Sequence, residues 1–231
     1  VSFYNIFNFI EFFGKLLGFF LRHMVYAKKL VVAQYDLIYL NEVLFKDNTA
    51  MGVLGLIAKG GAAVLGKDAI KMMQMLVDIE LKSFRDLPLK VIFIQNIVTD
   101  LLLGYEVKEI FYEYCEHIRK KYKTQPGFIT QNMPHMLQKL KEWDIKDVVL
   151  CSSFNRIGYL MSPDVNSYVE AAKNNNPREY QLIAMSTLAS GAIKPKEAYD
   201  FINQQNIQSV VFGASSKGHI EETMRLIQLH E

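Results

Sequence analysis

The sequence has few cysteines, a single tryptophan and no long run of like charges. Its 231 residues include two cysteines, Cys115 and Cys151, too few for a secreted disulfide scaffold and not spaced as a C-x-x-C metal site. We therefore expect both to be buried thiols in a reducing, cytoplasmic setting. The net charge of +2, with acidic and basic residues interspersed, gives no stripe for nucleic acid. The five histidines have no metal-ligand spacing, so no metal is expected.

The first 35 residues differ from the rest in their apolar character. Val1–Met24 is rich in Phe, Leu and Ile, but Glu11 and Lys15 interrupt a stretch that would need about 20 apolar residues to span a bilayer. It lacks the basic start and small-residue cleavage site of a signal peptide. We expect residues 1–35 to form an apolar helical segment ahead of a barrel domain at residues 36–231. This segment is either a buried or amphipathic helix, or a contact for a membrane surface or a partner.

From Lys90 onward, apolar and β-branched runs alternate with polar turns and segments of helical period. The five runs are Val91–Asn96, Phe128–Asn132, Val148–Asn155, Gln181–Thr187 and Ser209–Ser216. Such runs, separated by helices, predict a parallel sheet covered on both faces. With a further strand expected at Leu37–Asn41, they predict an α/β fold: a parallel (β/α)8 TIM-type barrel, incomplete or distorted at its N-terminal end. A doubly wound open sheet is the alternative.

The segments between these runs have apolar residues at helical spacing. A helix over Tyr105–Lys121 would carry one apolar stripe, and three later segments (134–143, 196–205 and 219–229) show the same period. The residues predicted to face inward are Val107, Ile110, Phe111, Tyr114, Ile118, Met136, Leu137, Leu140, Ala198, Phe201, Ile202, Ile220, Thr223, Met224 and Ile227. The range Met51–Leu81 also looks helical.

Polar side chains end each of the five predicted strands. They are mainly amides and hydroxyls: Gln95, Asn96, Gln131, Asn132, Ser152, Ser153, Asn155, Ser186, Thr187, Ser215 and Ser216, with Arg156 beside them. Because parallel strands end at one edge, we expect a shared pocket for a polar or anionic ligand, with Arg156 either a clamp for an anion or an exposed arginine. The alternative is that these groups only cap helices and satisfy turns.

Two glycine-containing loops follow the last two predicted strands. Ser190-Gly191-Ala192 precedes the helix that begins near Pro195, and Gly213 to Lys217 precedes the final helix. Glycine lets the backbone approach a ligand, free N–H groups at a helix start attract phosphate, and Lys217 adds positive charge. The loops therefore predict a phosphate site, with simple tight turns as the alternative.

The last forty residues resemble a known family. Ser209–Ile227 (SVVFGASSKGHIEETMRLI) resembles the last strand and helix of aldo/keto reductases, and Met185–Gly191 (MSTLASG) resembles the loop after their seventh strand, with Thr187 where proline is usual. The resemblance extends loosely back to Lys90. It implies a (β/α) barrel that binds NADP and exchanges hydride with a carbonyl substrate.

The resemblance also implies the positions of the cofactor site. Asn132 matches the amide that holds the nicotinamide carboxamide. Ser186, Leu188 and Gly191 match the loop along the pyrophosphate. Ser215, Ser216 and Lys217, after Gly213, match the segment around the adenosine phosphate, and Glu222 matches an adenine-contacting acid.

The chain departs from the family in its catalytic residues. The family uses an Asp, a Tyr, a Lys and a His. Here Gln95 stands where the His is expected, and Lys90 precedes its strand instead of ending one. No proton donor is recognisable, which keeps a second hypothesis open: a barrel protein that binds a phosphorylated small molecule without redox chemistry. A third is a binding or structural protein that associates through Val1–Met24.

Overall fold

The computed structural model describes residues 67–84 and 87–228. Contacts divide the chain into two compact units, Val1–Met72 and Met73–Glu231, and the second unit contains the sheet. The predictions for residues 1–35, including Val1–Met24, and for Leu37–Asn41 lie outside the described residues.

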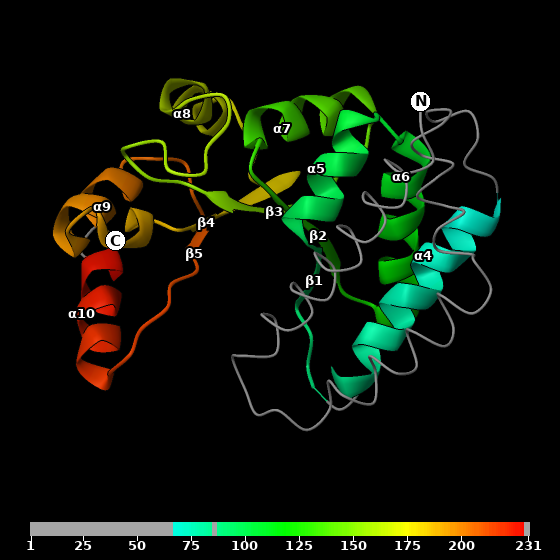
Figure 1. Cartoon of the computed structure of the whole chain (residues 1–231), viewed down its shortest axis with the longest axis horizontal. Coiled ribbons are helices and arrows are strands. Elements are labelled where there is room, and N and C mark those ends of the chain that lie inside the picture. Colours follow the sequence, from blue (N-terminus) through cyan, green and yellow to red (C-terminus); the bar gives the residue numbers. More distant parts are fainter. Residues whose placement is uncertain (1–66, 85–86, 229–231) are drawn as a thin grey trace, which may run out of the picture. The chain divides into compact units, whose positions relative to one another are not determined.

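Five parallel strands form one sheet in the order β1-β2-β3-β4-β5 (Figure 1). They are β1 (Val91–Ile94), β2 (Gln125–Thr130), β3 (Val148–Ser153), β4 (Tyr180–Met185) and β5 (Ser209–Val210). Each lies at one of the five predicted runs, so the α/β class and the parallel sheet are confirmed. The strand order never reverses, unlike that of a doubly wound sheet. Closure into eight strands is not seen among residues 67–84 and 87–228.

Helices connect consecutive strands, as parallel pairing requires. The connecting helices are α5 (Asn96–Gly104), α6 (Lys108–His117), α7 (Met133–Glu142), α8 (Val165–Lys173) and α9 (Pro195–Ile202). Helix α4 (Lys67–Glu80) precedes β1 and helix α10 (Lys217–Gln228) follows β5. Short turns η4 (Leu81–Phe84), η5 (Ile118–Tyr122, a π-helix) and η6 (Ala189–Gly191) complete the described elements. Sequence reasoning missed α5 and α8 and merged α6 with η5 into one helix.

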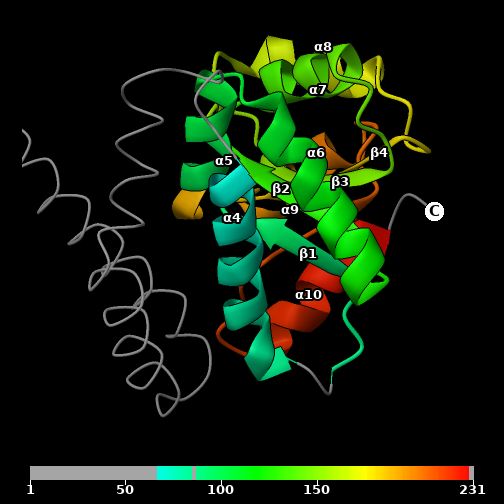
Figure 2. The ribbon, with the colours of Figure 1, turned by 90° about the vertical axis from the view of Figure 1, so that its right-hand side faces the viewer.

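One face of the sheet packs against helices α5 to α8, which Figures 1 and 2 show on the same side. Phe128 of β2 is fully buried there and its ring contacts Phe111 and Tyr114 of α6, with centroid separations of 5.2 and 5.5 Å. Leu150 and Leu182 continue the same row across β3 and β4 and are also fully buried. Right-handed crossovers between sequential parallel strands place their helices on one face, which explains this single helical layer.

The opposite face of the sheet is apolar and half-buried along β1 and β2. Phe93 lies over Gly127, and a Cβ at position 127 would meet its ring at 2.5 Å. Glycine at this point lets the Phe93 ring lie against the β2 backbone.

Most of the residues predicted to face inward are buried, but those of α10 are mostly exposed. The α6 stripe residues Val107, Ile110, Phe111, Tyr114 and Ile118 are all buried. In α10, by contrast, Thr223 is buried while Ile220 and Met224 are 46% and 44% exposed. The reason is limited packing, because α9 is the main described neighbour of α10. The side-chain amide of Asn203, which follows α9, donates to the Leu226 carbonyl at 3.0 Å.

The fifth predicted strand is much shorter than expected. Ser209–Ser216 was predicted as one run, but only Ser209 and Val210 pair with β4. The residues after Val210 include Gly213 and two serines, which favour a loop over a strand. The loop brings the chain to the start of α10.

Both cysteines are buried and free, as predicted. Burial raises the pKa of the Cys115 thiol to about 12 and that of the Cys151 thiol to about 11. Both therefore remain protonated and unreactive at neutral pH.

Candidate functional site

The carboxyl ends of all five strands lie at one edge of the sheet, because the strands are parallel. The predicted site residues that directly follow β1 to β4 therefore share this edge, but they differ in how their polar groups are used. Asn132, after β2, caps α7: its side-chain oxygen accepts from the His135 N–H at 3.3 Å. Gln95 lies at the start of α5 and Asn96 is its first residue. Asn132 therefore performs the helix-capping role that the sequence left open as the alternative for these polar residues.

A buried polar network behind this edge was not predicted from the sequence. Asp100 of α5 accepts from the Thr130 hydroxyl at 2.5 Å and from the Gln131 N–H at 2.9 Å. Burial raises the pKa of Asp100 above its ordinary value, against the opposing effect of these two hydrogen bonds. The Asp100 carboxylate fixes the backbone where β2 ends.

Tyr168 of α8 ties the same turn to β3. Its hydroxyl donates to the Gln131 carbonyl at 2.7 Å, lies 3.2 Å from the Ser152 hydroxyl and accepts from the Met133 N–H at 3.2 Å. Burial raises the pKa of Tyr168 as well. The network is therefore a rigid support for the loops at the carboxyl edge.

Asn155, after β3, is buried and shapes its own loop. Its amide oxygen accepts from the Tyr159 N–H, and its amide nitrogen donates to the Tyr159 carbonyl, both at 2.8 Å. The amide nitrogen also reaches the Ser186 carbonyl at 3.4 Å, so two predicted site residues from neighbouring strands meet here. Ser153, the last residue of β3, is fully buried and its hydroxyl has no hydrogen-bond partner among the described residues.

The loop after β4 has an unusual concentration of left-handed backbone. Ser186, Ala189, Ser190 and Gly191 all have positive φ, at 53°, 46°, 59° and 91°. Non-glycine residues rarely adopt this conformation, and such strain is concentrated at ligand-binding segments. Leu188 packs against a small buried cluster, which anchors the loop.

The segment after β5 lies on the surface. Ser216 caps α10 by accepting from the His219 N–H at 3.3 Å. Lys217 is 88% exposed and 3.5 Å from Glu221, and Gly213, Ser215 and Glu222 are exposed as well. Gly213 has open space where a Cβ would stand, so neither packing nor a positive φ requires glycine there. These residues are therefore exposed on the segment before α10 and on α10 itself.

A shallow hollow of about 410 Å³ opens beside these loops. Three cationic residues line it, Arg156 after β3 and Lys194 and Lys196 at the start of α9, together with the acidic Glu197 and Asp200 of α9. Arg156 pairs with Glu197 at 2.5 Å and Lys196 with Asp200 at 2.6 Å. Among the described residues Lys194 has no ion-pair partner. Of the predicted site residues, only Arg156 lines this hollow.

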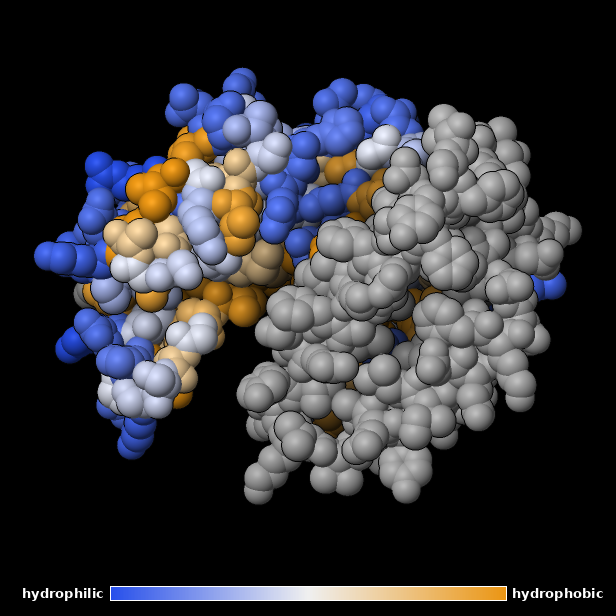
Figure 3. Space-filling model, viewed as in Figure 1, coloured by the Kyte–Doolittle hydropathy of each residue, from blue (hydrophilic) through white to orange (hydrophobic). Residues whose placement is uncertain are grey.

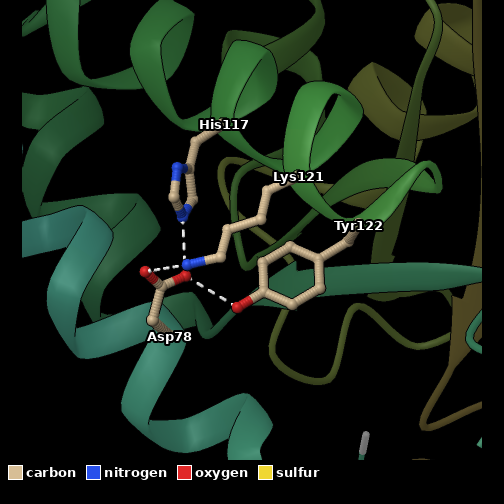
Figure 4. Close-up of polar contacts among 4 residues, drawn as sticks. All are labelled: Asp78, His117, Lys121 and Tyr122. Atoms are coloured by element: carbon tan, nitrogen blue, oxygen red, sulfur yellow. Dashed lines mark hydrogen bonds and ion pairs between the residues drawn. The ribbon is translucent and has the colours of Figure 1, made fainter.

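The opposite edge of the sheet holds a cluster that combines the four residue types of the reductase catalytic set (Figure 4). Asp78 of α4 contacts the His117 ring at 2.8 Å, the Lys121 ammonium at 2.5 Å and the Tyr122 hydroxyl at 2.6 Å. Burial by itself would raise the pKa of Asp78, but the hydrogen bonds from Lys121, Tyr122 and His117 lower it below its ordinary value.

This cluster lies at the amino end of β2, away from the edge where parallel β/α proteins hold their ligands. Tyr122 and Lys121 both contact the carboxylate of Asp78, so the cluster is an ion-pair network that holds α4 against α6 and η5. The His117 side chain is only 13% exposed, as a member of such a packed network. Sequence reasoning missed the cluster because Asp78 lies 39 to 44 residues from its partners.

Within 67–84 and 87–228, no group of three or more His, Cys, Asp or Glu side chains is placed to hold a metal ion. In the same part of the chain, no helix has both the length and the apolar character needed to cross a membrane.

Comparisons with protein-family models, with curated proteins and with solved structures find no match for this chain.

Proposed function

We propose that this chain binds a phosphate-bearing small molecule at the carboxyl edge of its parallel sheet. The observation that carries the proposal is the convergence of Arg156, Lys194 and Lys196 on one hollow beside the strained β4 loop. Cations and free backbone N–H groups at a helix start are the groups that bind phosphate in proteins. The buried support from Asp100 and Tyr168 holds the neighbouring loop in place, as a binding site requires.

NADPH is the ligand we propose to test first within this class. The two segments that resemble aldo/keto reductases, Ser186–Gly191 and Gly213–Lys217, follow the paired strands β4 and β5. A dinucleotide would have to span both segments, each of which follows one strand of this pair. Asn132 would have to give up its cap on α7 to hold a nicotinamide amide.

Hydride transfer to a carbonyl would also need a proton donor, which the resemblance assigns to no residue of this chain. The Asp, His, Lys and Tyr side chains that do meet lie at the other edge, and the Tyr122 hydroxyl donates to Asp78. We therefore propose ligand binding as the primary function, and reduction of a carbonyl as the second candidate, favoured by the resemblance of the segments after β4 and β5 to aldo/keto reductases.

Ligand binding predicts thermal stabilisation that depends on Lys194. A ligand at about 100 times its dissociation constant adds about 2.7 kcal/mol to the free energy of unfolding, or a Tm increase of about 5–10 °C for a domain of this size. We expect such an increase with NADPH, and a smaller one with inorganic phosphate against chloride at equal ionic strength. Lys194→Glu should reduce both, whereas Lys173→Glu, an exposed change on α8, should leave them unchanged.

The same melting experiment distinguishes binding of a phosphate ligand from reduction of a carbonyl with NADPH. Stabilisation by phosphate without any by NADPH would remove the reductase and keep the phosphate ligand. Unchanged Tm values with both compounds would overturn the proposal as a whole.

A further inference from the structure

A second cationic hollow lies at the amino edge of the sheet, beside the first residues of β2. Its volume is about 510 Å³, within the range of small-molecule sites. It is lined by Leu89, Lys90, Arg119, Lys123, Thr124 and Gln125. Three of these six residues are cationic and none is acidic.

The backbone around the hollow is held by hydrogen bonds between segments far apart in the sequence. The Thr124 hydroxyl lies 3.0 Å from the Leu89 carbonyl and 2.5 Å from the Lys90 carbonyl, so it joins the segment before β2 to the segment before β1. Arg119 donates to the carbonyls of Lys146 and Asp147 at 2.5 and 3.0 Å. The guanidinium is therefore held in place before any ligand arrives.

Two unusual backbone features position these cations. Arg119 belongs to the π-helix η5, and Lys123, which follows it, has a left-handed φ of 55°. Isolated π-helical turns occur frequently at functional sites, and a left-handed lysine is uncommon. Both features shape the segment before β2, which carries Arg119 and Lys123.

Neighbouring carboxylates neutralise other cations of this segment. Lys120 pairs with Glu116 at 2.9 Å and Lys121 with Asp78 at 2.5 Å. Among the described residues Lys90 and Lys123 have no carboxylate partner, and the closest carboxylate to Arg119 is Glu116 at 3.7 Å.

One further carboxylate lies near the rim. The Asp147 side chain accepts from the Gln125 amide at 3.2 Å. The positive charge of the lining therefore remains largely uncompensated.

We infer that this hollow binds the phosphate group of a second small molecule. A planar guanidinium with spare donors and two flexible ammonium groups match the tetrahedral oxygens of phosphate. A long polyanion is a poorer fit, because the nearby Lys120 and Lys121 are already paired with acids. The inference does not depend on the proposed function, since Lys90 and Lys123 lie at the amino edge and Lys194 lies at the carboxyl edge.

A titration with inorganic pyrophosphate, followed by amide NMR of the full chain, tests the inference one site at a time. We expect saturable shifts at the amides of Arg119 to Gln125. Replacing Lys90 and Lys123 together by alanine should weaken binding at these amides about tenfold or more, because the change removes two charged donors to the phosphate oxygens. Lys173→Ala is the matched control and should leave the affinity unchanged.

The two sites give separate signals in this titration. Shifts at Leu188 to Glu197 report the carboxyl edge, and they should persist in the Lys90/Lys123 variant. Absence of saturable shifts at 119–125, or equal affinity in the double variant and the unaltered protein, would overturn the second site while leaving the first one testable.

Discussion

Replacement of Phe128 by alanine is expected to lower the free energy of unfolding by about 3–5 kcal/mol. Phe128 is fully buried at the centre of β2 and its ring packs on Phe111 and Tyr114. The change removes these contacts and leaves a cavity that the paired strands β1 and β3 cannot close. Denaturant unfolding followed by circular dichroism gives the loss directly.

The control for this prediction lies on the same helix as the partners of Phe128. Tyr112 of α6 is 51% exposed, so Tyr112→Ala should change the stability by no more than about 0.5 kcal/mol. A loss below about 1 kcal/mol in Phe128→Ala would mean that α6 does not cover β2 as described.

Replacement of Asp78 by alanine is expected to cost about 2–3 kcal/mol at pH 7, because the change leaves His117, Lys121 and Tyr122 without their common partner. The loss should depend on pH. The pKa of Asp78 is lowered in the folded protein, so its contribution is present above the unfolded pKa of about 3.9 and disappears as the pH falls through the folded pKa.

Two further variants separate charge from hydrogen bonding at Asp78. Asp78→Asn keeps an acceptor for the Tyr122 hydroxyl but loses the charge that pairs with Lys121, so its cost should be intermediate. Glu109→Ala, an exposed change on α6, should be neutral. Equal destabilisation by Asp78→Ala at pH 7 and at pH 2.5 would contradict the role of the carboxylate.

The centre of the sheet was predictable from sequence because β3 is buried on both of its faces. All six residues of β3 are buried, and such a strand shows in the sequence as a continuous apolar run. The buried stripe of α6 followed from helical spacing for the same reason. At the edge of the sheet this signal fails: Ser209–Ser216 has strand-like composition, yet only Ser209 and Val210 pair.

The polar networks could not be predicted because they join distant segments. Asp100 meets Thr130 across 30 residues and Asp78 meets Lys121 across 43, and neither spacing leaves a local pattern. For the contact between Asp100 and Thr130, the one signal in the sequence was a polar Thr130 inside an apolar run. The hollow at Arg156 was predictable only in part, because Lys194 and Lys196 reach it from the next strand-end loop.

The most direct test of the carboxyl-edge site is a titration with NADPH, followed by energy transfer from Trp143 to the bound nucleotide. The account predicts saturable binding to the unaltered protein and a loss of about tenfold or more in affinity in both Lys194→Glu and Lys217→Glu, with Lys173→Glu unchanged. Equal affinity for NADPH in the unaltered protein and all three variants would contradict this account. No binding at millimolar NADPH together with no stabilisation by phosphate would contradict it as well.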